Sequence, residues 1–159
     1  MSTLTTIATI AAIMGSALIG GIFFTFSSFV MKALARLAPS EGIAAMQSIN
    51  IVVLNRWFLG VFMGTAVICM LLASFAVSRW EMSASPYLFG GAIAYVAGTW
   101  LVTILGNVPL NDRLAEVKPG DAGSSEVWQH YLVRWTRLNS VRTGAAMFAA
   151  LLFCAGLVF

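Results

Sequence analysis

Four long stretches without a charged side chain dominate this chain. It has nine basic and six acidic residues among 159. An α-helix needs about 20 apolar residues to cross the hydrocarbon core of a bilayer, and in lipid every backbone polar group must be paired within the helix. The sequence therefore predicts an all-α transmembrane four-helix bundle. The uncharged stretches are Met1–Met31, Trp57–Ser78, Met82–Asn111 and Thr143–Phe159. The corresponding spans are expected at residues 4–31, 57–78, 87–108 and 142–159.

Composition agrees with a single membrane domain covering residues 1–159. Hydrophobic residues make up 60% of the chain and charged residues 9%, which leaves no segment for a separate soluble domain. Basic residues flank the apolar stretches and do not cluster on one exposed face, so the net charge of +3 does not indicate a nucleic-acid partner. The first apolar stretch has no basic residue before Lys32, so we interpret it as a retained span and not as a cleaved signal peptide.

The basic residues also predict an orientation. With four spans, both termini share one side with the loop that contains Arg79 and Glu81. Basic residues concentrate on the cytoplasmic side of membrane proteins. We therefore expect an integral protein of a bacterial inner (plasma) membrane, with both termini outside and loops 32–56 and 109–142 in the cytoplasm. The eight basic residues of the expected cytoplasmic side are Lys32, Arg36, Arg56, Arg113, Lys118, Arg134, Arg137 and Arg142.

Short helical segments are expected on the cytoplasmic side. Ser40 has the side chain of a helix N-cap, and the residues after it, Ile43–Asn55, have the composition of a helix at the interface or one that continues into the second span. Pro109 is expected to kink or end the third span, because proline lacks an N–H group and clashes with the preceding turn. Lys118–Asp121, with the sequence KPGD, is typical of a turn.

The remaining composition argues against a resident metal or redox centre. Cys69 and Cys154 each lie in an apolar stretch, where we expect two buried small side chains, and His130 is the single histidine. These residues do not form a set of metal ligands, and we expect no cofactor. Small residues four positions apart, at Gly60 and Gly64 and along 90–98, predict close helix packing within the chain or a homo-oligomer contact.

Polar side chains at the edges of the spans are the candidates for chemistry, because such residues are costly in a membrane. In a helix, Trp128, Tyr131, Trp135, Asn139 and Arg142 fall on one face, whereas Arg134 and Arg137 point elsewhere. One interpretation is a pocket for a flat hydrophobic ligand; the other is that these residues anchor and cap the helices. The remaining polar candidates are Gln47, Asn50, Asn55, Asn107 and Asn111.

Four parts of the chain together resemble the DUF1772 family, also called the anthrone oxygenase family, of small four-span membrane proteins. They are Gly20–Ala33, Gly42–Asn55, Asn107–Leu114 (NVPLNDRL) and the series from Trp128 to Arg142. Fungal members with assigned roles are similar to oxygenases that convert anthrones to anthraquinones. Many members carry His immediately after the Asn that matches Asn139, whereas this chain has Ser140.

The resemblance implies a cofactor-independent oxygenase for a flat, anthrone-like aromatic compound. In this hypothesis Arg142 holds the enolate oxygen together with Asn107 or Asn111, and His130 is the default base. Ring contacts come from Trp135 and Tyr131. The other expected substrate-binding residues are Trp128, Asn139 and Asn50. The alternative is a non-enzymatic scaffold, accessory subunit or hydrophobic-ligand-binding protein.

Overall fold

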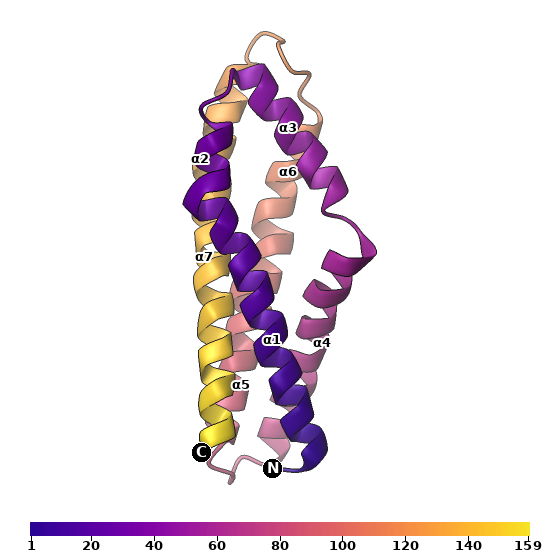
Figure 1. Ribbon diagram of the computed structural model, residues 1–159, viewed down its shortest axis with the longest axis vertical. Helices are drawn as coiled ribbons and strands as arrows, with labels where there is room; N and C mark the ends of the chain where they lie inside the picture. Colours follow the sequence, from indigo (N-terminus) through magenta and orange to yellow (C-terminus); the bar gives the residue numbers. More distant parts are fainter.

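Four helices of the computed structural model, which describes residues 1–159, are long and apolar enough to cross a membrane. They run antiparallel in sequence order, with both termini at one end of the bundle (Figure 1). No strands are present. The expected all-α four-span bundle is therefore confirmed, and the chain is an integral membrane protein. The four helical segments are Thr3–Leu34, Arg56–Ser78, Ser85–Ala115 and Ser124–Val158.

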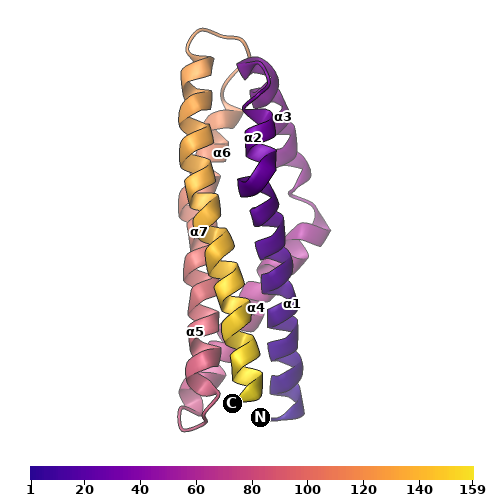
Figure 2. The same ribbon diagram turned by 60° about the vertical axis from the view of Figure 1, so that its left-hand side comes forward.

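The first segment is built from α1 (Thr3–Thr25), a π-helical stretch η1 (Phe26–Val30) and α2 (Met31–Leu34). Its small residues allow α1 to lie along α7 (Ser124–Val158), and the two helices stay side by side in both ribbon views (Figures 1 and 2). Close approach of this kind replaces lipid contacts with van der Waals packing between helices.

A separate helix, α3 (Pro39–Val52), precedes the second span, α4 (Arg56–Ser78). The expected N-cap at Ser40 is wrong. The helix begins at Pro39, with Ala38 in the N-cap position two residues earlier than expected, and the Glu41 carboxylate accepts a hydrogen bond from the Ala38 N–H (3.2 Å). Asn55 caps α4, because its side-chain oxygen accepts from the N–H groups of Trp57 and Phe58, both at 3.0 Å. The chain therefore bends sharply between α3 and α4.

The third span contains α5 (Ser85–Tyr95), two π-helical stretches, η2 (Val96–Leu101) and η3 (Thr103–Asn107), and α6 (Val108–Ala115). Pro109 does not end this helix, which runs on to Ala115. A proline clashes with the carbonyl group four residues before it, and here that residue, Leu105, lies inside η3. The wider π turns therefore accompany the proline within a continuous segment.

The fourth helix, α7, begins at Ser124. The aromatic series and the apolar stretch expected as the fourth span therefore belong to one helix of 35 residues. Between α6 and α7 lies the expected turn, in which the Asp121 N–H donates to the Lys118 carbonyl (3.2 Å). At 1.5 Å per residue α7 is about 53 Å long, well beyond the hydrocarbon thickness of roughly 30 Å. The bundle therefore extends out of the hydrocarbon core.

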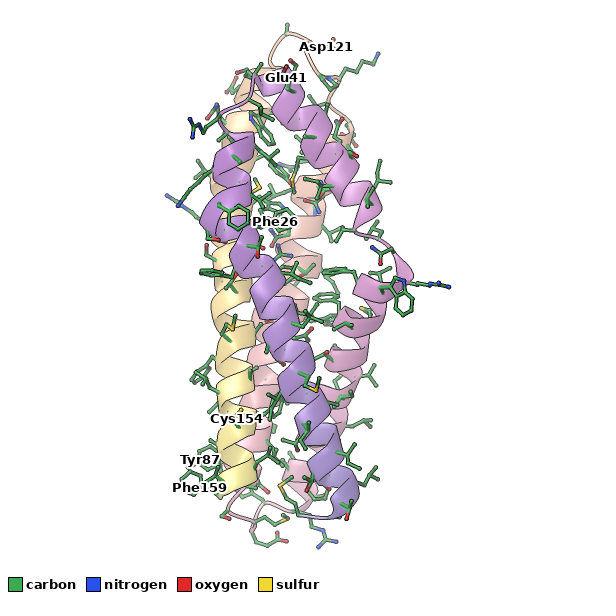
Figure 3. The ribbon with its side chains drawn as sticks, in the orientation of Figure 1. Phe26, Glu41, Tyr87, Asp121, Cys154 and Phe159 are labelled. Carbon is green, nitrogen blue, oxygen red and sulfur yellow. The ribbon has the colours of Figure 1, made fainter.

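We call the end that carries α3 and the 116–123 loop the α3 end, and the opposite end the terminal end. Figure 3 shows Glu41 and Asp121 at the α3 end, and Tyr87 and Phe159 at the terminal end. Buried apolar side chains form a larger cluster toward the terminal end and a smaller one at the α3 end. The smaller cluster contains Met31, Leu34, Ile43, Met46, Leu114, Trp128, Tyr131 and Trp135.

Two expectations about side chains need correction. Cys69 is buried, but Cys154 is exposed on the outer face of α7. The pair Gly60 and Gly64 does not pack within the chain, since a Cβ atom at either position would meet nothing within 4 Å; the alternative, a homo-oligomer contact, stays a prediction. Gly98, in contrast, lies against α7, where an added Cβ would come within 2.5 Å of the Ala145 Cβ.

Candidate functional site

The expected face of α7 is buried over its whole length. Trp128, Tyr131, Trp135, Asn139 and Arg142 are each no more than 5% exposed. The intervening Arg134 and Arg137 are exposed. Along this face the rings of Trp128 and Tyr131 stack at 5.7 Å, and those of Tyr131 and Trp135 at 6.1 Å. The 3–4 spacing thus builds an aromatic column that leads to two polar residues.

Arg142 is the charged residue inside the bundle. One terminal nitrogen of its guanidinium donates to the Thr103 hydroxyl (3.1 Å), and the other donates to Asn139 Oδ1 (2.7 Å). The guanidinium carbon lies 4.0 Å from the ring centre of Phe23 and 5.2 Å from that of Trp135. Stacking of this kind is a favourable cation–π contact. The Nε atom is buried and has no hydrogen-bond partner.

No carboxylate balances this charge. All six acidic residues are exposed, and the hydrogen bonds of Arg142 go only to neutral groups. A buried charge is costly unless it is paired. Arg142 is therefore a buried basic side chain whose hydrogen bonds go only to neutral groups of the chain.

Asn139 and Asn107 lie behind this site and hold it in place. Asn139 donates to the Phe23 carbonyl (2.6 Å) and to the Ser27 hydroxyl (2.7 Å), which ties α7 to α1 and η1. Asn107 donates to the Trp135 carbonyl (3.2 Å). The π-helical stretches η1 and η3 thus lie beside Asn139 and Arg142, and η2 does so through Thr99, whose hydroxyl donates to the Arg142 carbonyl (3.2 Å). Such stretches occur frequently at functional sites.

An apolar cavity of about 190 Å³ faces Arg142, and we call it the inner cavity. It lies between the two buried clusters, and aromatic rings form much of its wall. Leu54, Leu59, Ile104 and Val108 line it and are also 36–66% exposed, so the cavity opens to the outer surface between α4 and the η3–α6 part of the third span. Its other lining residues include Phe23, Phe26, Phe58, Phe62, Trp100, Thr103, Trp135, Asn50 and Asn111.

A second, larger cavity of about 650 Å³, the outer cavity, continues from the inner one. Asn50 and Asn111 line both, and they share the hydroxyl group of Tyr131. That hydroxyl donates to Asn111 Oδ1 (2.8 Å) and accepts a long hydrogen bond from Asn50 Nδ2 (3.5 Å). Asp112 also lines the outer cavity.

The structure thus brings Asn50, Asn111, Trp135 and Arg142 around one cavity and places Asn107 and Asn139 directly behind it. Trp128 packs in the α3-end cluster. His130 is exposed and lines a different cavity, of about 530 Å³, with Arg113, Glu116 and Glu126. Tyr131 is buried and also borders that cavity.

Three residues at this site were not among the candidates from the sequence. Phe23 and Thr103 touch the guanidinium, and Asp112 lines the outer cavity. Phe23 lies in Gly20–Ala33 and Asp112 in Asn107–Leu114, two of the parts that carry the family resemblance, and this was the signal available for them. Thr103 lies in an uncharged stretch where nothing distinguishes it from its neighbours.

Comparison with known proteins identifies the family. The model described as Anthrone oxygenase matches residues 54–152, which is more than half of the chain, so the chain belongs to the anthrone oxygenase family. The matched range includes Asn107–Leu114 and the series from Trp128 to Arg142. It excludes Gly20–Ala33 and all but the end of Gly42–Asn55, so the family match is narrower than the resemblance suggested. No curated protein and no solved structure matches the chain.

Proposed function

We propose that this member of the anthrone oxygenase family oxygenates a flat, hydrophobic, anthrone-like aromatic compound within the membrane, without a metal or organic cofactor. The observation that carries the proposal is Arg142, a buried guanidinium that has no carboxylate partner and faces an apolar cavity. In an aromatic enolate, the negatively charged oxygen would pair with the guanidinium, and the apolar rings would fill the cavity.

The position of the cavity supports entry of the substrate from the bilayer. Arg142 lies about 24 Å from the Val158 end of α7 at 1.5 Å per residue, which is within a hydrocarbon core of roughly 30 Å. The opening beside Leu59 and Ile104 is apolar. A compound dissolved in lipid therefore reaches the site without crossing water.

Aromatic side chains supply the ring contacts. Phe26 and Trp135 lie with their ring centres 5.7 Å apart, and Phe58 and Phe62 stack at 5.8 Å on the α4 side. Flat ligands bind well between such rings, because aromatic contacts add to apolar burial. The inner cavity exceeds the roughly 150 Å³ of an engineered cavity that binds benzene, and a ring system of three rings extends toward the outer cavity.

The proposed reaction requires two things of the protein: removal of one proton from the substrate and stabilisation of the enolate oxygen. Loss of one proton from the carbon opposite the anthrone carbonyl gives an enolate, whose oxygen Arg142 stabilises. Addition of O₂ at that carbon and protonation give a hydroperoxide, and loss of water leaves the second carbonyl of the anthraquinone. One atom of O₂ remains in the product and the other leaves as water. Thr103 and Asn139 hold the guanidinium in place throughout.

The substrate proton leaves through the outer cavity in this proposal. No His, Asp or Glu lines the inner cavity, whereas the outer cavity contains Asp112 and is large enough for water. The earlier candidate base, His130, lines a separate cavity, and its role stays a prediction that a variant tests below.

We also propose that the α3 end faces the cytoplasm of a bacterial cell. Seven of the nine basic residues lie on the loops and exposed helix surfaces of that side, Arg142 is buried in the bundle, and only Arg79 lies on the other side. The positive-inside rule favours this orientation over the reverse.

Oxygen uptake by purified protein treated with a chelator tests the function. Given an anthrone in detergent micelles, the protein should consume one O₂ for each anthraquinone formed, faster than micelles alone. A rate no higher than that of micelles would refute the oxygenase. Activity that appears only after iron or copper is added would refute cofactor independence.

One observation favours the non-enzymatic alternative. Gly60 and Gly64 leave an outward face of α4 without contacts, as in helices that pack against another membrane protein. An accessory subunit or scaffold would bind the aromatic compound, or a partner, without consuming oxygen in the same assay.

A further inference from the structure

We propose that Asn50 and Asn111 form a pair that recognises a hydroxyl group, and that this pair selects aromatic ligands carrying a free hydroxyl at the mouth of the inner cavity. The inference deepens the proposed function and rests on it for the aromatic ring of the ligand. The inference names the substituent of the aromatic ring that is recognised and the residues that bind it.

The hydrogen bonds of Asn111 fix the orientation of its amide. Its Oδ1 atom accepts from the Tyr131 hydroxyl (2.8 Å) and from the indole N–H of Trp135 (2.9 Å). An indole N–H can only donate, so the atom facing Trp135 must be the oxygen. The Nδ2 group of Asn111 is therefore left to face the cavities, and it makes no hydrogen bond within the chain.

The Tyr131 hydroxyl also determines the orientation of the Asn50 amide. Because the hydrogen of the Tyr131 hydroxyl points to Asn111, its oxygen accepts from Asn50, and that places the Nδ2 group of Asn50 toward Tyr131. The Oδ1 atom of Asn50 has no partner within the chain. Asn50 also lines both cavities, so this oxygen is an acceptor available to a ligand.

Together the two amides offer the free NH2 group of Asn111 as a donor and the free carbonyl oxygen of Asn50 as an acceptor, held next to each other by a single tyrosine. A hydroxyl group uses both, because it accepts from Asn111 and donates to Asn50. A carbonyl or methoxy oxygen uses only the donor and leaves the Asn50 oxygen unpaired. At the end of the inner cavity away from the outer cavity, Arg142 offers only hydrogen-bond donors. The two ends of the cavity therefore differ, and a ligand with a ketone or enolate oxygen and a hydroxyl binds in one direction.

Binding of three product-like compounds tests this assignment. We choose 2-hydroxyanthraquinone, 2-methoxyanthraquinone and anthraquinone, which do not consume oxygen. Binding is followed by quenching of the intrinsic tryptophan fluorescence, because Trp100 and Trp135 line the cavity. The quantity compared is the Kd of the methoxy compound divided by that of the hydroxy compound. An unpaired buried acceptor should make this ratio roughly 5 to 150 in the unaltered protein.

Two variants locate the effect. Asn50→Leu removes the acceptor and loses only the long contact to Tyr131, so the ratio should fall to about 1. Leu54→Ala is the matched control. Leu54 also lines both cavities but has no polar group, so all three compounds should weaken alike and the ratio should persist. A ratio near 1 in the unaltered protein, or one unchanged by Asn50→Leu, overturns the assignment.

The outcome separates this inference from the proposed function. A high ratio that depends on Asn50, without oxygen uptake from an anthrone, supports the hydroxyl pair and refutes the oxygenase. Oxygen uptake with a ratio near 1 refutes the pair alone. If Asn50→Leu does not fold, the ratio in the unaltered protein decides.

Discussion

Replacing Arg142 by lysine keeps a positive charge in α7 but removes the planar guanidinium. Arg142 makes two hydrogen bonds to different elements, to Thr103 in η3 and to Asn139 in α7, and stacks on Phe23. A single ammonium group cannot keep both bonds and the stacking. Loss of one hydrogen bond to a charged group should lower the free energy of unfolding by about 1.5–3 kcal/mol.

The effect on catalysis should be larger than the effect on folding. A donor that stabilises an oxyanion typically contributes on the order of 10²–10³ in turnover, so Arg142→Lys should insert and fold yet lose most anthrone oxidation. Turnover is measured by oxygen uptake at saturating anthrone. Folding is measured by thermal unfolding in detergent, followed by circular dichroism.

A matched control variant distinguishes a loss of catalysis from a loss of stability of the bundle. Thr103→Val removes the same hydrogen bond from the other side, together with the bond from Thr103 to the Thr99 carbonyl (2.7 Å), but keeps the guanidinium. It should lower stability by about 1–3 kcal/mol and keep turnover within roughly tenfold of the unaltered protein. Near-normal turnover in Arg142→Lys would refute the oxyanion role and leave Arg142 as a structural anchor.

Four further outcomes are expected. Reporter fusions at Lys118 and at the C-terminal Phe159 should give opposite readouts, cytoplasmic and external; the same readout at both would refute the topology. Gly98→Ala should destabilise the bundle by about 1–3 kcal/mol, because its methyl group would come within 2.5 Å of the Ala145 Cβ on α7, whereas Gly60→Ala, which meets nothing, should be neutral or stabilising in thermal unfolding. His130→Ala should retain turnover, since His130 lies outside the inner cavity; a large loss would establish it as the base. Elemental analysis of purified protein should find no stoichiometric iron or copper, because no three His, Cys, Asp or Glu side chains lie close enough to share a metal ion; a firmly bound metal would contradict the mechanism.

The spans were predictable because charge is so costly in lipid. Fifteen charged residues placed mostly between apolar stretches leave few alternatives for the helices. The buried face of α7 was predictable for a related reason, since steps of three and four residues place side chains on one side of any helix. Trp128, Trp135 and Arg142 are buried as this spacing requires.

The local geometry of the third and fourth spans was harder to predict. A proline in the sequence favours a kink or an end, but neighbouring helices stabilise a continuous helix through η3 and α6. The sequence predicts a fourth span that begins at Arg142, the last charged residue before the uncharged stretch Thr143–Phe159. Arg142 instead lies within α7, because Asn139, Thr103 and two aromatic rings surround its charge inside the bundle.

The sequence alone determined that this is a four-span membrane protein with polar and aromatic residues gathered toward one end. Only the tertiary structure decided how those residues divide between roles. It placed Asn50 and Asn111 at a cavity mouth, Asn107 and Asn139 behind the wall, and His130 in another cavity. The polarity and spacing of residues predict which side of a single helix is buried. The hydrogen-bond partner of each amide lies on another segment, 20 or more residues away along the chain. Helix register and packing fix such pairs, and a single sequence does not encode them as a local pattern.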